Sequence, residues 1–437
     1  MSTHFRMQAK IILTMYVGYA AMMVCRQMVT ILSPAMLVDP TLDLTKTNIG
    51  DFLAYGTIGA LVGKIVWGPL TDRVGGRSTF LLGIGLTASL VIAFGMSPNV
   101  IAFTTFSFLI YCTKSSGWPG MTKLVANWIH PNKYGRAWAI LSTSSRASVV
   151  LGTLFFGWLL GQIHWRSVAY ISAGLAIAIL ILCHFFLAEK PADSAFLERD
   201  NYNGDDAEME KEGAKALENL RSHPLKNSTL LQGLLEFSTS HRVWLIIVVM
   251  MVLTCMMAFL DFTSIYLMEV YQLTPAKAAI TSAVFPLGSL GGLLLSIAFY
   301  DRFSKPGIRN VLTITMIIAL GCILSLQYLP AFGFSEDITF DLARLFLFLF
   351  GLSISPAYYI PMSVFSIEYG GPYSATLVCL LDAFGFAASA SFAFVGGRLA
   401  DSSGGWNSFM NMVVLITLIA TVAVWAFMHG EYKSSKT

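Results

Sequence analysis

The sequence has little charge. Only 12% of its 437 residues are Asp, Glu, Lys or Arg, about half the fraction found in soluble domains, whereas 55% are hydrophobic and the mean hydropathy is +0.67. The net charge of +3 comes from scattered positive residues, so nucleic acid is not expected as a partner. The sequence contains no nucleotide-binding loop, nucleophile triad or metal-ligand cluster, so neither an enzyme nor a cofactor or metal is expected. The composition instead predicts a protein whose solvent is lipid.

The sequence also lacks paired cysteines. Its six cysteines lie far apart in apolar runs and form no CxxC motif, which favours small buried residues over disulfides or metal ligands. The N-terminus begins with basic residues, as a signal peptide does, but its apolar run is too long and ends at no small-residue cleavage site. We therefore interpret it as a first transmembrane helix.

Apolar runs of about 20 residues, long enough to cross a hydrocarbon core as helices, recur along the chain. We place twelve of them near 10–37, 48–70, 78–96, 100–126, 136–161, 167–188, 243–268, 276–299, 309–329, 341–366, 373–400 and 406–428. The pattern predicts an all-α membrane protein with twelve transmembrane helices.

One long polar stretch, residues 189–242, divides the runs into six and six. We expect it to be a central loop, part helix and part linker, between an N-terminal six-helix bundle (1–188) and a C-terminal six-helix bundle (243–437). Lys and Arg gather in one set of short connections and at both termini, which predicts that the termini and the central loop are cytoplasmic, in a bacterial inner membrane.

The two halves echo each other. The segment GPLTDRVGGR follows the second run and IAFYDRFSKPGIR follows the eighth, while Trp165 opens the sixth run and Trp406 opens the twelfth. A parallel repeat of six plus six spans is typical of one large transporter class, with two pseudo-symmetric bundles.

The segment GPLTDRVGGR resembles the signature loop of the major facilitator superfamily at Gly68, Asp72, Arg73, Gly75 and Arg77. Gly68 is expected to let two helices approach closely. The acid and the two arginines are expected to form a cytoplasmic ion-pair latch that acts in gating.

More narrowly, the chain resembles the organophosphate:phosphate antiporter family, which includes glycerol-3-phosphate and glucose-6-phosphate transporters. The stretches GYAAMMVCRQ, VGKIVWGPLTDR, SSGWPGMTKLVANW and WAILSTSSRASVVLG carry this resemblance, together with AEKPAD at the start of the central loop. The resemblance implies that Arg26 is a substrate arginine, that Tyr19 is a site tyrosine and that Lys64 is the family's second-helix lysine.

The chain departs from that family at several site positions. Counting back from Asp261 puts Met256, with Met257 beside it, where the family has a second substrate arginine on its seventh helix. The family's fifth-helix histidine position is Ser145, and a fourth-helix glutamine position is Lys114. The usual phosphate clamp from both halves is therefore not expected.

Four intramembrane cations, Arg26, Lys64, Lys114 and Arg146, all lie in the N-terminal half. Each costs roughly 2.5–3.5 kcal/mol at the middle of a membrane helix, so we expect them to face a cavity between the halves rather than lipid. Tyr19 precedes Arg26 by two helical turns and shares its face. A structural ion pair is the alternative for each cation, and Lys64 has a snorkelling position as a further alternative.

Two intramembrane carboxylates, Asp261 and Asp382, lie in the C-terminal half. They are candidate counter-charges or proton carriers in coupling, and structural pairing with the cations is the alternative.

We therefore expect a secondary active transporter that moves a small anionic or zwitterionic organic solute by alternating access. In this interpretation Arg26 binds the anionic group, and Lys114 and Arg146 add to the positive field. An organophosphate/phosphate antiporter, an amino-acid proton symporter and a transporter-like solute sensor are the alternatives. The expected partners are the solute, membrane lipids and a coupling ion, either a proton or a counter-anion, and the chain is expected to be a monomer.

Overall fold

The computed structural model describes residues 3–129, 134–190, 230–300, 305–360, 369 and 374–434. Every regular element in these ranges is a helix, which confirms the predicted fold class. The first helices are α1 (Thr3–Leu37), α2 (Lys46–Val74), α3 (Gly76–Met96), α4 (Val100–Lys114), α5 (Gly117–Trp128), α6 (Tyr134–Leu160) and α7 (Trp165–Phe186). They are followed by α9 (Leu230–Thr239), α10 (His241–Ala258), α11 (Leu260–Val270), α12 (Pro275–Ser282), α13 (Val284–Tyr300), α14 (Lys305–Tyr328), a 3-10 helix (Leu329–Phe332), α15 (Glu336–Ile360), α17 (Ser374–Asp401) and α18 (Gly405–Ser434).

Eleven spans within the described residues are long and apolar enough to cross a membrane. The remaining predicted run, 100–126, is divided into α4 and α5 because the chain tightens at Ser115 and Ser116, whose N–H groups donate to the third residue back. The same one-turn tightening separates α10 from α11 at Phe259 and α12 from α13 at Ala283. Such short 3-10 turns within long helices often mark hinges.

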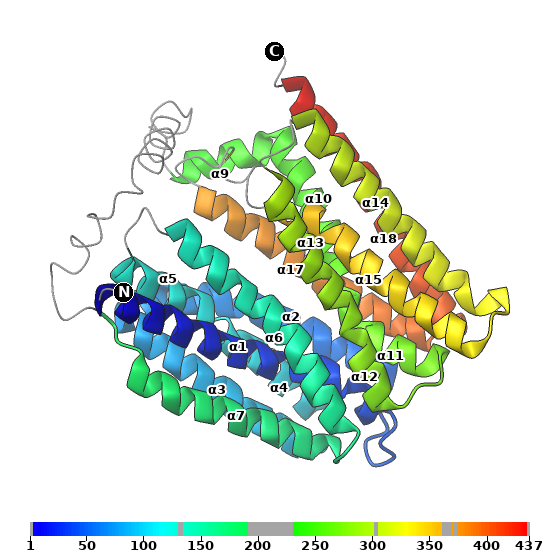
Figure 1. The fold of residues 1–437 in the computed structure, drawn as a ribbon, viewed down its shortest axis with the longest axis horizontal. Helices are drawn as coiled ribbons and strands as arrows, with labels where there is room; N and C mark the ends of the chain where they lie inside the picture. The colour runs from blue at the N-terminus through cyan, green and yellow to red at the C-terminus, as the bar shows by residue number, and fades with distance from the viewer. Residues whose placement is uncertain are drawn as a thin grey trace. The chain divides into compact units, whose positions relative to one another are not determined.

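The chain forms two compact units (Figure 1). The first comprises Met1–Leu42 and Tyr55–Asn219, and the second comprises Asp43–Ala54 and Leu220–Thr437. Helix α2 therefore begins in the second unit and continues in the first. The predicted N-terminal bundle, residues 1–188, instead contains the whole of α2.

Glycines let α2 approach α4 closely in the first unit. A Cβ added at Gly59 or Gly63 would overlap the carbonyl oxygen of Phe108 or Cys112, so no larger residue fits there without moving the backbone. Gly68 does not have the expected role, because a Cβ added there would meet nothing within 4 Å. The close approach predicted at Gly68 is made at Gly63 and Gly59 instead, five and nine residues earlier on the same helix.

A cluster of aromatic rings forms the core of the second unit. Phe259, at the break between α10 and α11, contacts Phe285, Phe350 and Phe409 at centroid separations of 6.2, 5.8 and 6.1 Å. All four rings are almost fully buried. The break in the seventh span is therefore packed from three sides, which fixes the direction in which α11 leaves α10.

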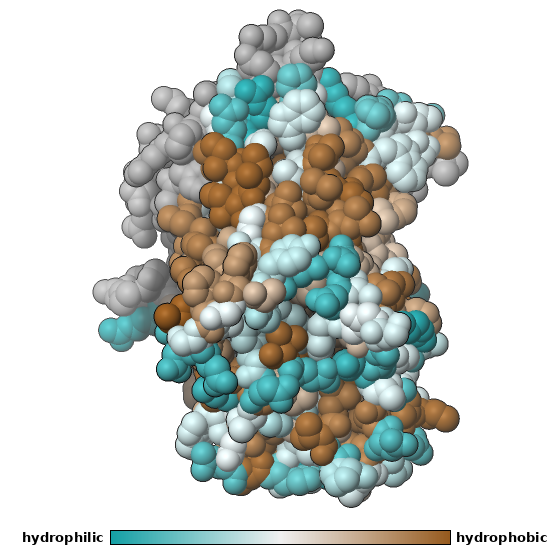
Figure 2. Space-filling model, turned by 90° about the vertical axis from the view of Figure 1, so that its right-hand side faces the viewer, coloured by the Kyte–Doolittle hydropathy of each residue, from teal (hydrophilic) through white to brown (hydrophobic). Residues whose placement is uncertain are grey.

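The outward faces of many helices are apolar. On the side where α14 and α18 lie in Figure 1, Figure 2 shows broad hydrophobic areas. The large apolar side chains exposed on these two helices include Ile314, Ile317, Leu415, Leu418, Val422 and Trp425. Exposed apolar area on this scale fits contact with lipid. The chain is thus a multi-pass integral membrane protein, as predicted.

The two units repeat one contact. The indole N–H of Trp165 donates to Asp39 Oδ2 at 2.8 Å, and the indole N–H of Trp406 donates to Glu269 Oε2 at 2.8 Å. Each tryptophan lies at the start of its unit's last spanning helix, and each acid lies near the end of its unit's first spanning segment. This correspondence supports the repeat predicted from the two tryptophans. The second echoing loop, at 301–304, lies outside the described residues.

The pKa of Asp39 reflects these contacts. Partial desolvation acts to raise its pKa, but hydrogen bonds from Thr41 and Trp165 and the nearby His164 ring together lower it to about 2. The carboxylate is therefore ionised at any ordinary pH.

Candidate functional site

Two cations of the first unit lie over tyrosine rings at the crossing of α1 and α4. The Arg26 guanidinium carbon is 4.7 Å from the centre of the Tyr111 ring, and Lys114 Nζ is 5.4 Å from the centre of the Tyr19 ring. Each helix thus contributes one cation and one aromatic ring, and the structure brings together three of the predicted substrate residues, Arg26, Lys114 and Tyr19.

The ring beneath Arg26 is held firmly. Tyr111 is only 2% exposed, and a Cβ added at Gly56 on α2 would meet its ring carbons at 3.2 Å. Gly56 therefore leaves room for the ring between α2 and α1. Arg26 is half-buried, and its guanidinium has five N–H donors in a planar fork that can bind an anion.

The second ring, that of Tyr19, depends on the break in the fourth span. A Cβ added at Gly117, the first residue of α5, would meet two Tyr19 ring carbons at 2.7 and 2.8 Å. The glycine of the GWPG segment therefore lets the tyrosine ring lie directly against the helix. Tyr19 is 5% exposed, so this contact fixes the surface over which Lys114 lies.

An aromatic chain continues from Tyr19. Its ring meets Trp118 edge-on at 6.0 Å, and Trp118 meets Trp138 at 4.7 Å with 32° between the ring planes. The three rings come from α1, α5 and α6, which all belong to the first unit. Because Trp118 is 43% exposed, part of its indole can contact other molecules.

Attraction to a ring only partly compensates a buried cation. Cation–π contacts contribute about 0.5–2 kcal/mol each, less than the roughly 2.5–3.5 kcal/mol that a cation costs at the middle of a membrane helix. A ring contact therefore does not by itself account for a cation at this depth.

The other predicted cations occupy different helices. Arg146 is half-buried on α6, next to half-buried Ser145, and Lys64 is exposed on α2. Met256, at the expected place of a second arginine, is completely buried in the second unit. Its thioether carries no charge with which to bind an anion.

The two candidate carboxylates lie on separate helices of the second unit. Asp261 is in the first turn of α11, two residues after the Phe259 break, and it is half-buried. Asp382 is half-buried on α17, three residues before Gly385, where an added Cβ would meet Thr254 Oγ1 at 2.8 Å. The close approach of α17 to α10 thus positions the helical turn that bears Asp382.

The signature loop has different ion-pair partners from those expected. Asp72 pairs with Lys123 on α5, with 3.3 Å between Oδ1 and Nζ, rather than with Arg77. The Arg77 side chain instead donates to the carbonyl groups of Leu187 and His184 at the end of α7. Two backbone N–H groups at the start of α3 donate to the Glu189 carboxylate. Arg73 is exposed on the last turn of α2.

These contacts differ from ion pairs among the loop's own residues, and a gating role for the loop stays a prediction. The arginine of the loop serves to attach α3 to α7, because three helix ends meet there, and a lysine supplies the counter-charge of the acid. Asp72 is 81% exposed, so its pair with Lys123 is weakly stabilising at most.

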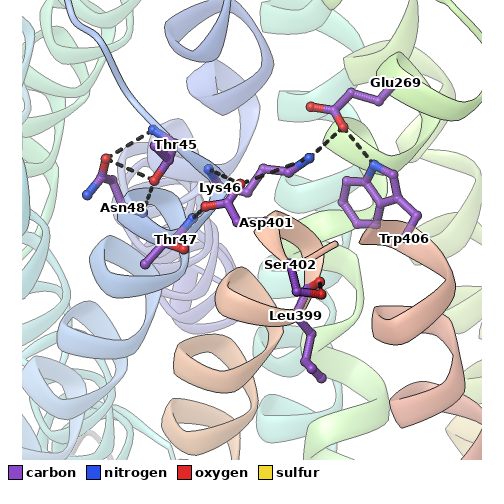
Figure 3. Close-up of polar contacts among 9 residues, drawn as sticks. All are labelled: Thr45, Lys46, Thr47, Asn48, Glu269, Leu399, Asp401, Ser402 and Trp406. Atoms are coloured by element: carbon purple, nitrogen blue, oxygen red, sulfur yellow. Dashed lines mark hydrogen bonds and ion pairs between the residues drawn. The ribbon is translucent and has the colours of Figure 1, made fainter. Parts of the chain in front are cut away.

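A polar cluster in the second unit holds the start of α2 (Figure 3). Lys46 Nζ lies 2.9 Å from Glu269 Oε2, which also accepts the hydrogen bond from Trp406. Asp401 accepts hydrogen bonds from the backbone N–H groups of Lys46 and Thr47, as a carboxylate does at a helix N-terminus. The cluster therefore joins α2 to α11, α17 and α18.

Close backbone packing reinforces that cluster. A Cβ added at Gly50 would meet the Ala393 carbonyl oxygen at 2.6 Å, and one added at Gly397 would meet the Lys46 carbonyl oxygen at 2.7 Å. Asp51, the residue after Gly50, pairs with Arg398, with 2.9 Å between Oδ1 and Nη1. The first turns of α2 are thus attached to α17 by packing and by charge.

Several of these residues are absent from the sequence-based prediction. Tyr111 and Trp118 look like ordinary apolar positions in the sequence, and their roles become visible only when α1, α4 and α5 are packed. Gly117 carries a readable signal, because the GWPG segment places two glycines and a proline within four residues of a spanning segment, which marks a break. Lys123 follows the break by less than two turns. No group of three or more His, Cys, Asp or Glu side chains suited to a metal occurs among the described residues.

Comparisons with known proteins agree with this architecture. The model of the Major Facilitator Superfamily matches residues 15–390. A probable hexose phosphate transport protein of Chlamydia trachomatis is 23% identical over 422 residues, which cover 94% of this chain and 89% of that protein. The membrane sensor protein UhpC of Escherichia coli is 26% identical over 333 residues, which cover 75% of this chain and 71% of that protein.

Among solved structures, a bacterial homolog of the human lysosomal transporter Spinster, in an inward-facing and unoccupied conformation, has the same fold. Its TM-score is 0.68 at 16% identity, and the match covers 98% of this chain and 97% of that one. The predicted resemblance to organophosphate:phosphate antiporters is confirmed by the relatives. The chain therefore belongs to the major facilitator superfamily, and its function is the secondary transport of a small solute.

Proposed function

We propose that the chain moves a small organic anion or zwitterion across the membrane by alternating access, with Arg26 and Lys114 binding the anionic group. The observation that carries this proposal is the pair of cation–ring contacts at the crossing of α1 and α4. Two positive charges held over buried rings in one helical bundle form a preorganised site for a negative group. Arg146 and Lys64 add positive field from α6 and α2.

Asp261 and Asp382 are proposed to couple transport to a proton or to bind the cationic group of a zwitterion. The positions of the two residues support this role, because both are half-buried acids on spanning helices of the second unit. The coupling ion in this proposal is a proton, and a counter-anion is the alternative that exchange would require.

Two further functions are each favoured by a relative. The similarity to a probable hexose phosphate transport protein over 94% of this chain favours an organophosphate/phosphate antiporter. The similarity to a membrane sensor protein favours a chain that binds solute and signals without flux. An amino-acid proton symporter is the zwitterion case of the main proposal.

The proposed setting is a bacterial inner membrane, in which the chain is a monomer with cytoplasmic termini and a cytoplasmic central loop at 189–242. The Lys and Arg distribution supports the proposed orientation of the termini and the central loop. Single cysteines in a cysteine-free background test it: Ser238→Cys, on exposed α9, should resist an impermeant thiol reagent in intact cells, while Ser335→Cys should react. The reverse pattern would overturn the orientation.

The transport function is tested with purified protein in sealed liposomes. Liposomes preloaded with an unlabelled candidate anion should accumulate the labelled form by counterflow, and Arg26→Lys should reduce that accumulation. Binding without flux for every anion bound would favour the sensor. Exchange that requires inorganic phosphate inside would favour the organophosphate antiporter.

A further inference from the structure

Tryptophan side chains in this protein fall into two groups. The sequence has nine, and five of them donate their indole N–H to an acceptor, a carbonyl in three cases and a carboxylate in two: Trp67, Trp128, Trp165, Trp244 and Trp406. The indole N–H groups of the other four, Trp118, Trp138, Trp158 and Trp425, donate to none of the described residues. Among these four, Trp118 and Trp138 contact each other, with 4.7 Å between their ring centroids.

The position of Trp118 distinguishes it from a tryptophan anchored in lipid headgroups. It lies ten residues before the end of α5 at Trp128, about 15 Å along a helix at 1.5 Å per residue. An indole N–H facing hydrocarbon at that depth would be desolvated without a hydrogen bond, which is unfavourable. The 43% of Trp118 that is exposed therefore suits contact with water or a polar solute rather than lipid tails.

This exposed indole is continuous with the proposed anion site. Trp118 meets the edge of Tyr19, and Tyr19 carries the Lys114 ammonium over its face. A positive charge and a flat aromatic surface thus lie within a few side chains of each other in one unit, and the surface ends in indole N–H donors. A solute that contacts both the positive charge and the aromatic surface would carry a negative group on a flat, apolar ring.

We propose that the solute is a planar aromatic carboxylate, with its carboxylate at Arg26 and Lys114 and its ring stacked on Trp118. This inference rests on the proposed function and narrows its substrate class. A ring presents a π-face to the indole in the offset-stacked geometry that aromatic pairs prefer, and its own substituents can accept from the indole N–H.

The polar surroundings are less suited to a sugar. Hydroxyl groups transferred to an apolar site need hydrogen-bond partners. Beside Trp138 on α6, the hydroxyl groups of Ser142 and Ser145 donate to carbonyl groups of their own helix at 2.7 and 3.0 Å. The surface therefore offers stacking area more than it offers hydroxyl partners.

The experiment measures binding of two matched probes, benzoate and cyclohexanecarboxylate, by titration calorimetry on the purified full-length chain. The two acids have the same charge and ring size, and they differ in aromaticity. We expect benzoate to bind about 2- to 10-fold more tightly, the range that aromatic pairing contributes beyond area. The preference should disappear in Trp118→Leu and persist in Trp118→Phe.

Trp158→Leu is the matched control, because Trp158 is 54% exposed near the end of α6 and contacts Phe155 rather than the Tyr19 chain. It should keep the wild-type preference. If Trp118→Leu does not fold, the wild-type ratio and Trp118→Phe still decide the question.

The outcomes separate the inference from the function on which it rests. Equal binding of both acids, with both weakened by Arg26→Lys, would overturn the aromatic assignment and leave the anion transporter intact. Binding of glucose 6-phosphate alone would overturn the inference in favour of the organophosphate antiporter. If no organic anion binds, both the inference and the proposed function are wrong.

Discussion

Replacing Arg26 with lysine keeps the positive charge but removes the planar guanidinium. In the structure, the guanidinium carbon lies 4.7 Å from the centre of the Tyr111 ring, and a guanidinium can bind a carboxylate through two parallel hydrogen bonds. Lysine presents a single ammonium and can replace only one of them. A hydrogen bond to a charged group contributes about 1.5–3 kcal/mol, so losing one should weaken solute binding about 10- to 150-fold.

Calorimetric titration of the purified variant measures this loss directly, and thermal unfolding without solute reports whether the protein remains folded. Tyr111→Phe provides the matched control, because it keeps the ring beneath the cation and removes only the hydroxyl. It should bind within a few-fold of wild type, since the ring face supplies the cation–π attraction. An Arg26→Lys protein that is folded and binds within threefold of wild type would refute the assignment of Arg26 to the anionic group.

Three further sets of substitutions test other parts of the structure. Gly59→Ala should lower stability by about 1–3 kcal/mol, because its Cβ overlaps a backbone carbonyl, whereas Gly174→Ala, which meets nothing within 4 Å, should unfold at or above the wild-type temperature. Asp261→Asn or Asp382→Asn should abolish pH-driven accumulation and spare solute exchange if the acid carries the proton. Wild-type accumulation, exchange and thermal stability in both variants would exclude the two acids from coupling. Asp39→Asn should unfold at a lower temperature than wild type above about pH 4. The difference should shrink as the pH falls towards 2, because the contacts that lower the pKa of Asp39 stabilise the folded protein only while the carboxylate is ionised. A difference that stays constant from pH 6 to pH 2 would contradict this account.

Much of the architecture was predictable because hydrophobic length is a strong signal. A run near 20 apolar residues has few alternatives to a spanning helix, and Trp165 and Trp406 correctly indicated a repeat whose two copies make the same indole–carboxylate contact. The cations were also recognisable, since Arg26 and Lys114 stand out in apolar runs. The division of the fourth span at Ser115 was missed because apolar residues continue on both sides of the short polar segment 113–117.

The partners of these residues were harder to predict, because they depend on which helix faces which. Arg77 was expected to pair with Asp72 five positions away, yet it bonds to carbonyl groups at the end of α7, more than a hundred positions along the chain. Tyr111 carries no sign in the sequence that it will lie beneath Arg26. Gly68 belongs to a recognisable motif, but the interhelical distance at that turn is too large for the absence of a side chain to matter.

Helix α2 has a mechanical consequence. Its 29 residues form a rod about 44 Å long, and its first turns belong to one compact unit while the rest belongs to the other. Any change in the relative placement of the units must therefore bend this rod near residues 54–56 or peel its first turns from α17. The ion pairs of Lys46 and Asp51 are partly exposed, so each contributes about 1 kcal/mol or less to this attachment, and the close packing at Gly50 and Gly397 adds to it. Bending of α2, or separation of its first turns from α17, fits the microsecond-to-millisecond times of domain motion. The stiffness of α2 would then limit the turnover rate of transport.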